Sequence, residues 1–191
     1  MQENQEKFIE LVREKNLGKS LKYAILTMGC QLNENDSEKI AGMLEEMKYE
    51  YIEDFKEADL IVFNTCCVRE NAEERLFGKI GEVKKLKESK NVILAIGGCM
   101  MQEPAMLDKI KKSYPFVNVI FGTHTMQNLP ENIYKAIVEN EKVKDKSFSF
   151  SQKKEKIIFD FSLILLSEGR PNAYAEAREA YEYNDSTGWT T

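Results

Sequence analysis

The sequence predicts an α/β fold in which a doubly wound, mostly parallel sheet of about four to five strands is flanked by helices, of the Rossmann/flavodoxin-like kind. Short apolar runs alternate with amphipathic stretches throughout residues 21–140. The runs at 59–64 and 91–96 are nearly continuously apolar, as expected of strands that a parallel sheet buries on both faces. With 191 residues, 42% of them hydrophobic and 31% charged, the chain can form a packed core.

The individual elements follow from hydrophobic period and from residues that start helices. The expected strands are residues 22–28, 50–52, 59–64, 91–96 and 116–121. A helix is expected to begin near Asn33 or Asp36, since both are good caps, and it carries an apolar stripe at Ile40, Met43, Leu44 and Met47. Further helices are expected at 69–88, from Pro104 onward, and at 129–138.

The chain divides into three parts. Residues 1–20 form a polar lead with a short amphipathic helix, and residues 21–140 form the compact α/β domain. Residues 141–191 are a charged linker followed by an atypical tail, with a possible helix at 173–183. The net charge of −5 means that nucleic-acid binding would need a local basic patch.

The cellular compartment is expected to be the cytoplasm. The sequence has no apolar run of membrane-spanning length, and it begins without a basic, apolar secretory signal. Thiols in that compartment stay reduced, which favours metal-binding or catalytic cysteines over structural disulfides.

Three cysteines follow expected strands directly: Cys30, Cys66 and Cys99. Parallel strands end at one edge of a sheet, and open α/β sheets bind their ligands beyond that edge. Three thiolates gathered there favour a soft-metal or iron–sulfur site, and on a cuboidal cluster they would leave one iron without a protein ligand. The alternative is that each cysteine is an inert buried residue.

The neighbouring residues refine this hypothesis. Gly29, Gly97 and Gly98 allow tight turns and a close approach of backbone N–H groups to a cluster. Cys67 follows Cys66, and because side chains alternate along an extended segment, we interpret it as a core or turn residue and not as a ligand.

Three motifs occur around these cysteines: Met28-Gly-Cys-Gln-Leu-Asn-Glu-Asn-Asp-Ser-Glu, Asn64-Thr-Cys-Cys-Val-Arg-Glu-Asn-Ala-Glu and Gly97-Gly-Cys-Met. Over residues 21–140 the chain resembles the N-terminal domain of the radical S-adenosylmethionine methylthiotransferases, and most closely the MiaB-like group, which methylthiolates an N6-isopentenyladenosine beside the tRNA anticodon. The resemblance implies that Cys30, Cys66 and Cys99 hold an auxiliary four-iron four-sulfur cluster that takes part in sulfur insertion. Asn33, Asp36, Arg69 and Glu70 match polar positions of the family motifs.

The chain also departs from that family. Its members continue into a barrel whose Cys-x3-Cys-x2-Cys loop binds the cluster that cleaves S-adenosylmethionine, whereas this chain has four cysteines and none beyond Cys99. Residues 161–191 do not resemble the start of that barrel. The expectation is therefore a truncated or altered form that carries the auxiliary cluster and is inactive alone. S-adenosylmethionine and the second cluster would belong only to the intact enzyme.

Two other functions stay open: a stand-alone iron–sulfur or metal carrier, and a flavodoxin-like interaction domain with inert cysteines. tRNA is the partner expected of the intact enzyme, with weak or absent binding by this chain. Lysines on two expected helices could contact phosphates or form an ordinary solvated surface: Lys84, Lys85, Lys87, Lys109, Lys111 and Lys112. His124 is expected in a turn at the ligand edge, and Tyr114 and Phe116 in the core.

Overall fold

The computed structural model describes residues 2–67, 71–145, 158–160, 183–184 and 188–189. Residues Met1–Phe161 form one compact unit and Ser162–Thr191 form another. In the second unit the described residues form a short antiparallel strand pair, β7 (Tyr183–Asn184) with β8 (Gly188–Trp189). The helix expected at 173–183 lies outside the described residues except for Tyr183, which belongs to β7.

The first unit is built on a parallel sheet with strand order β2-β1-β3-β4-β5-β6. Its strands are β1 (Leu21–Met28), β2 (Tyr49–Tyr51), β3 (Leu60–Thr65), β4 (Ile93–Gly98), β5 (Val119–Phe121) and β6 (Ile158–Asp160). Every pairing is parallel, so the doubly wound α/β fold is confirmed. The sheet has one strand more than expected, because β6 also pairs with β5. β6 is only three residues long, which is too short for a hydrophobic period to be recognised in the sequence.

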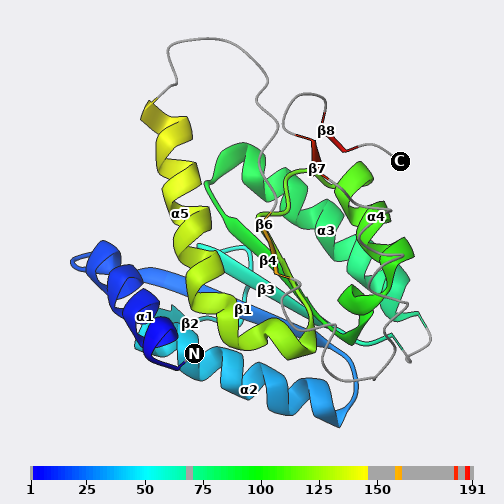
Figure 1. Cartoon of the computed structure of the whole chain (residues 1–191), viewed down its shortest axis with the longest axis horizontal. Coiled ribbons are helices and arrows are strands. Elements are labelled where there is room, and N and C mark those ends of the chain that lie inside the picture. Colours follow the sequence, from blue (N-terminus) through cyan, green and yellow to red (C-terminus); the bar gives the residue numbers. More distant parts are fainter. Residues whose placement is uncertain (1, 68–70, 146–157, 161–182, 185–187, 190–191) are drawn as a thin grey trace. The chain divides into compact units, whose positions relative to one another are not determined.

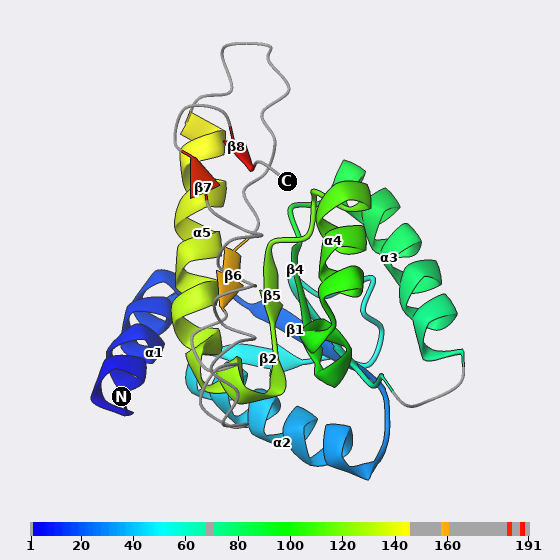
Figure 2. The same cartoon turned by 45° about the vertical axis from the view of Figure 1, so that its right-hand side comes forward.

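Helices cover both faces of this sheet, as Figures 1 and 2 show. One face carries α1 (Gln2–Asn16), α2 (Gln31–Glu46) and α5 (Leu129–Asp145). The other carries α3 (Ala72–Ser89) and α4 (Pro104–Ser113). Among the described residues, none of the helices combines the length and apolarity that a membrane crossing requires.

The position of β3 in the middle of the sheet explains why its sequence is almost wholly apolar. All six of its residues are buried. Ile61 and Phe63 pack in the core beneath α3 and α4, whereas Leu60 and Val62 pack in the core beneath α1, α2 and α5. Successive side chains of a strand point to opposite faces, so a strand between two cores needs apolar residues on both.

Helix α2 begins earlier than expected. Its first residue is Gln31 and its N-cap is Cys30, so Asn33 and Asp36 lie inside the helix and are not its caps. Both are buried. The Asn33 side chain still serves the helix start, because its Oδ1 accepts the backbone N–H of Cys30 at 3.2 Å, as a residue at the third helical position can.

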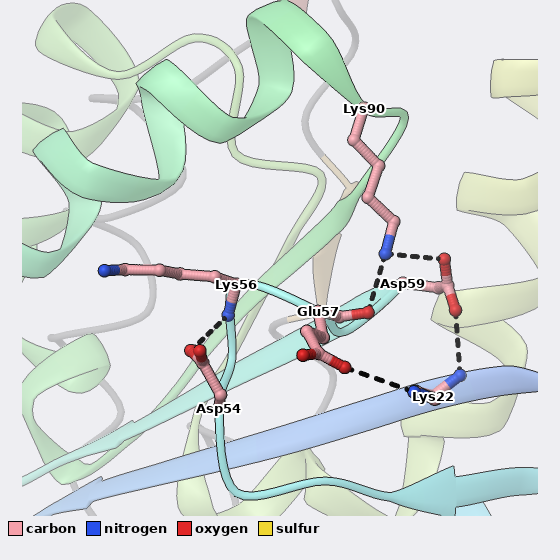
Figure 3. Close-up of polar contacts among 6 residues, drawn as sticks. All are labelled: Lys22, Asp54, Lys56, Glu57, Asp59 and Lys90. Atoms are coloured by element: carbon pink, nitrogen blue, oxygen red, sulfur yellow. Dashed lines mark hydrogen bonds and ion pairs between the residues drawn. The ribbon is translucent and has the colours of Figure 1, made fainter.

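Charged side chains tie together the amino ends of the three central strands (Figure 3). Asp59 accepts the backbone N–H of Lys22 at 2.8 Å and pairs with the Lys90 ammonium at 3.0 Å. Lys90 also donates to the Glu57 carbonyl at 2.7 Å. These residues precede or begin β1, β3 and β4, so the contacts fasten the edge of the sheet opposite the cysteines.

Candidate functional site

The predicted cysteines lie where the chain changes direction in the sheet. After β1 the chain enters α2 on one face, and after the neighbouring β3 it enters α3 on the other. Ligands of open α/β sheets bind beyond the carboxyl ends of the strands at such a switch point. Cys30 lies two residues beyond β1, and Cys66 and Cys99 directly follow β3 and β4, so all three occupy this edge.

Cys66 and Cys99 follow the neighbouring strands β3 and β4. Cys66 is buried, and its backbone N–H donates to the Met28 carbonyl at 3.1 Å. The Cys99 thiol donates at 3.7 Å to the carbonyl of Thr65, the residue that precedes Cys66. Thr65 is itself held by its hydroxyl, which donates to the Gly97 carbonyl at 2.8 Å. The paired ends of β3 and β4 therefore bring the Cys99 thiol to the backbone next to Cys66.

Cys30 connects to the same carbonyl through one side chain. Its thiol donates to Asn33 Oδ1 at 3.4 Å, and the Nδ2 of Asn33 donates to the Thr65 carbonyl at 3.3 Å. The Cys30 and Cys99 side chains are both half-buried, and all four cysteines have free thiols. The structure thus links the three predicted residues around the end of β3.

Cys67 is exposed in the bend after β3, so of its two interpretations the turn residue fits and the core residue does not. Its backbone N–H donates to the Cys99 sulfur at 3.1 Å. Burial raises the pKa of the Cys99 thiol above its usual value, and the Cys67 N–H acts in the opposite direction.

Two glycines let the strand ends approach each other. Gly98 has a φ of +105°, and a β-carbon there would overlap the backbone of Thr65. A β-carbon on Gly97 would overlap the Phe121 ring. The glycines thus allow a tight turn and close packing at the strand ends, and the approach of their N–H groups to a cluster stays a prediction.

The donor set fits an iron–sulfur cluster. Thiolates are the usual protein ligands of such clusters, and each binds a different iron, so the thiols need not meet at one point. In the part of the chain that the structure describes, no three His, Cys, Asp or Glu side chains gather closely enough for a single metal ion. The assignment of Cys30, Cys66 and Cys99 as ligands stays a prediction.

Other predicted residues have varied surroundings. Asp36 is buried in α2 and pairs with the exposed Lys39 at 3.3 Å, and His124 is exposed just after β5. Arg69 and Glu70 lie outside the described residues. Tyr114 and Phe116 are half-buried and pack against the core, as expected.

Half of the six candidate lysines interact within the chain. Lys87 donates to the Phe116 carbonyl at 2.6 Å and to Asn118 at 2.8 Å. Lys109 pairs with Glu73 at 2.6 Å, and burial lowers the pKa of Lys111, which interacts with Asp108. Lys84, Lys85 and Lys112 are exposed.

Sequence reasoning missed three polar residues that support the site: Ser37, Asn64 and Thr65. Asn64 and Thr65 are buried at the end of β3, and Ser37 Oγ accepts a hydrogen bond from Asn64 Nδ2 at 3.0 Å. The available signal was an asparagine and a threonine that end an otherwise apolar strand. Buried polar groups need hydrogen-bond partners, so such a pair points to a network at the strand end.

The region that carries these residues is similar in sequence to known proteins. The synthase named tRNA-2-methylthio-N(6)-dimethylallyladenosine synthase from Clostridium perfringens (strain SM101 / Type A) is 49% identical over 133 residues, which cover 69% of this chain and 30% of that protein. The protein of the same name from Thermoanaerobacter sp. (strain X514) is 44% identical over 142 residues, covering 74% of this chain and 30% of its own length.

A third protein of that name, from Acetivibrio thermocellus, is 45% identical over 148 residues, covering 74% of this chain and 31% of its own length. The chain thus spans about a third or less of the curated relatives it matches, and the resemblance to the N-terminal domain of the MiaB-like group is confirmed. The model of the uncharacterized protein family UPF0004 matches residues 22–122, just over half of the sequence. The chain therefore belongs to the UPF0004 family.

Proposed function

We propose that this chain provides the auxiliary iron–sulfur domain of a tRNA methylthiotransferase that modifies N6-isopentenyladenosine beside the anticodon. The observation that carries the proposal is the placement of Cys30, Cys66 and Cys99 at the carboxyl ends of three adjacent parallel strands. The names of the relatives support the reaction class and tRNA as substrate of the whole enzyme.

In this proposal the three thiolates would hold a four-iron four-sulfur cluster, with the fourth iron free of protein ligands. When bound, the cluster would supply an open iron site for the sulfur chemistry of the enzyme. The chain's own residues would shape that site. Asn33 fixes the Cys30 loop, the Cys67 N–H donates to the Cys99 sulfur, and Gly98 lets the backbone turns close around the edge.

Radical cleavage of S-adenosylmethionine belongs, in this proposal, to a separate three-cysteine site of the whole enzyme. With four cysteines and three assigned here, only Cys67 remains on this chain. The net charge of −5, and the internal contacts of Lys87, Lys109 and Lys111, support weak tRNA binding by the chain alone. A cytoplasmic location follows from the same proposal.

The test is anaerobic reconstitution of the full chain with ferrous iron and sulfide, followed by iron and sulfide analysis. We expect about four iron and about four sulfide per chain, with visible iron–sulfur absorbance. A variant with alanine at Cys30, Cys66 and Cys99 is the control and should bind neither. If the unaltered chain binds no more iron than this variant, the cysteines are inert and the proposal is wrong.

A further inference from the structure

Two buried asparagine side chains lie directly beside the cysteine edge and bind each other. Asn33 comes from the first turn of α2 and Asn64 from β3, and they are only 3% and 1% exposed. Asn33 Nδ2 donates to Asn64 Oδ1 at 3.0 Å, and Asn64 Nδ2 donates to the backbone carbonyl of Asn33 at 2.8 Å. We call this pair the amide clasp. It fastens the start of α2 to the end of β3.

Backbone groups determine the orientation of both amides. Asn33 Oδ1 faces the N–H of Cys30, which can only donate, and Asn33 Nδ2 faces the carbonyl of Thr65, which can only accept. Asn64 Nδ2 faces the carbonyl of Asn33, so its Oδ1 is left to accept from Asn33. Neither amide can rotate by half a turn without losing these hydrogen bonds.

The clasp lies between the cysteines. On one side Asn33 Oδ1 accepts both the N–H and the thiol of Cys30. On the other side Asn33 Nδ2 and the Cys99 thiol donate to the same Thr65 carbonyl. The position of Cys30 relative to Cys66 and Cys99 therefore depends on a chain of hydrogen bonds that passes through one carboxamide.

The backbone around the amide clasp is closely packed against its two side chains. A β-carbon on Gly29 would overlap the Asn33 carboxamide. A β-carbon on Gly98 would lie 2.8 Å from Asn64 Oδ1 and would overlap the Thr65 carbonyl. Close packing of this kind resists displacement, so the clasp has the rigidity that a positioning device needs.

We propose that Asn33 and Asn64 are positioning residues that hold Cys30 in place for cluster binding. Asn33 acts directly on the Cys30 loop, and Asn64 acts through Asn33 because none of its hydrogen bonds reaches a cysteine. The role in the cluster rests on the proposed function, whereas the positioning of Cys30 is a property of the metal-free chain and is testable without iron.

Asn118 supplies a matched control. It is also a buried asparagine, 5% exposed, and its Oδ1 accepts the N–H of Leu94 at 2.9 Å and the ammonium of Lys87 at 2.8 Å. It directly precedes β5, at the opposite edge of the sheet from the cysteines. Asn118→Ala should therefore lower stability, as a clasp variant does, without affecting Cys30.

The first experiment measures alkylation of the metal-free full chain by iodoacetamide, with each cysteine followed by peptide mass spectrometry. Asn33→Ala and Asn64→Ala should each speed alkylation of Cys30 by about fivefold to tenfold, the factor that one lost hydrogen bond represents. The double variant should add little to either single one, because both break one network. Asn118→Ala should leave the Cys30 rate unchanged. Circular dichroism selects a temperature at which every variant is folded.

The result that overturns the inference is an Asn64→Ala chain whose Cys30 reacts no faster than in Asn118→Ala. If Asn33→Ala or Asn64→Ala fails to fold, Ser37→Ala replaces it. That change removes the 3.0 Å hydrogen bond from Asn64 Nδ2 to Ser37 and the 2.7 Å one between Ser37 and Thr27, leaves the contacts between Asn33 and Asn64 in place, and should give a smaller increase at Cys30.

The second experiment compares the reconstituted proteins by electron paramagnetic resonance and by midpoint potential. Asn64→Ala should shift the spectrum or the potential of the bound cluster, and Asn118→Ala should change neither. If the unaltered chain takes up no iron, the proposed function and the cluster part of this inference fail together, while alkylation still decides the positioning of Cys30. If the cluster forms and Asn64→Ala leaves it unchanged, the inference fails and the proposed function stands.

Discussion

The four cysteine side chains differ in burial and in their hydrogen bonds, so single substitutions can separate their roles. Cys66 is buried, Cys30 and Cys99 are half-buried, and Cys67 is exposed. The contact that Cys67 makes through its backbone N–H to the Cys99 sulfur does not depend on its own thiol. The exposed cysteine is therefore the one whose side chain the proposed site needs least.

Alanine at Cys30, Cys66 or Cys99 should abolish visible iron–sulfur absorbance after reconstitution, because each change removes a ligand thiolate. Cys67→Ala should keep most of the absorbance, since alanine retains the N–H that donates to Cys99. Absorbance and iron content of the four variants check this. A cluster that forms unchanged in Cys99→Ala would show that the ligand assignment is wrong.

Ionisation of the Tyr49 phenol makes the stability of the folded chain depend on pH in the alkaline range. Burial raises the pKa of Tyr49 from 10.0 to about 12. Above about pH 10 the unfolded chain loses this proton while the folded chain keeps it, so the free energy of unfolding falls as pH rises, by at most about 1.4 kcal/mol per pH unit. The contribution is fully present below that pH.

Tyr49→Phe should therefore reduce the fall in unfolding free energy between about pH 10 and about pH 12, measured by urea unfolding. The fall should not vanish, because burial also raises the pKa of Tyr23. Tyr51→Phe is the control, since Tyr51 is exposed. An equal fall in Tyr49→Phe and in the unaltered chain would contradict the prediction.

Among the elements, β3 depends on Asp59 at its amino end. The Asp59 carboxylate accepts the N–H of Lys22 and pairs with Lys90 (Figure 3). Asp59→Ala should lower the free energy of unfolding by about 1–3 kcal/mol, because a backbone N–H loses its charged acceptor. Lys90→Ala should lower it by less than about 1 kcal/mol, because it removes a partly exposed ion pair with Asp59 and an exposed hydrogen bond to the Glu57 carbonyl. Urea unfolding compares the two, and equal losses would contradict this account.

The elements also show how far sequence patterns reach. The central strands were predictable because burial on both faces requires apolar runs, and the placement of three cysteines at one edge followed from parallel strands. The predicted start of α2 was a few residues too late. An asparagine can accept a backbone N–H at the start of a helix from inside the first turn, as Asn33 does, so its presence does not mark the cap itself. The link between Asn33 and Asn64 joins residues 31 positions apart, and no local pattern specifies such a contact.

At the scale of the whole molecule, the chain matches about 30% of the length of its relatives. On the proposed function, the reconstituted chain should not cleave S-adenosylmethionine, because the proposal gives that reaction to a second cluster and leaves only Cys67 unassigned. The assay supplies S-adenosylmethionine, a reductant and isopentenylated tRNA, and measures deoxyadenosine. Deoxyadenosine above the level of a no-protein control would refute the prediction.

The sixth strand has a consequence for any shortened version of this protein. β6 pairs with β5 through Val119, Ile120 and Phe121, which are all buried. A chain cut after α5, at Asp145, would lack β6 and leave β5, still paired with β4, as an edge strand whose outward backbone N–H and C=O groups lack partners. An apolar edge of this kind is a template on which a second copy can add a strand, so solubility and self-association would change although every cysteine remained.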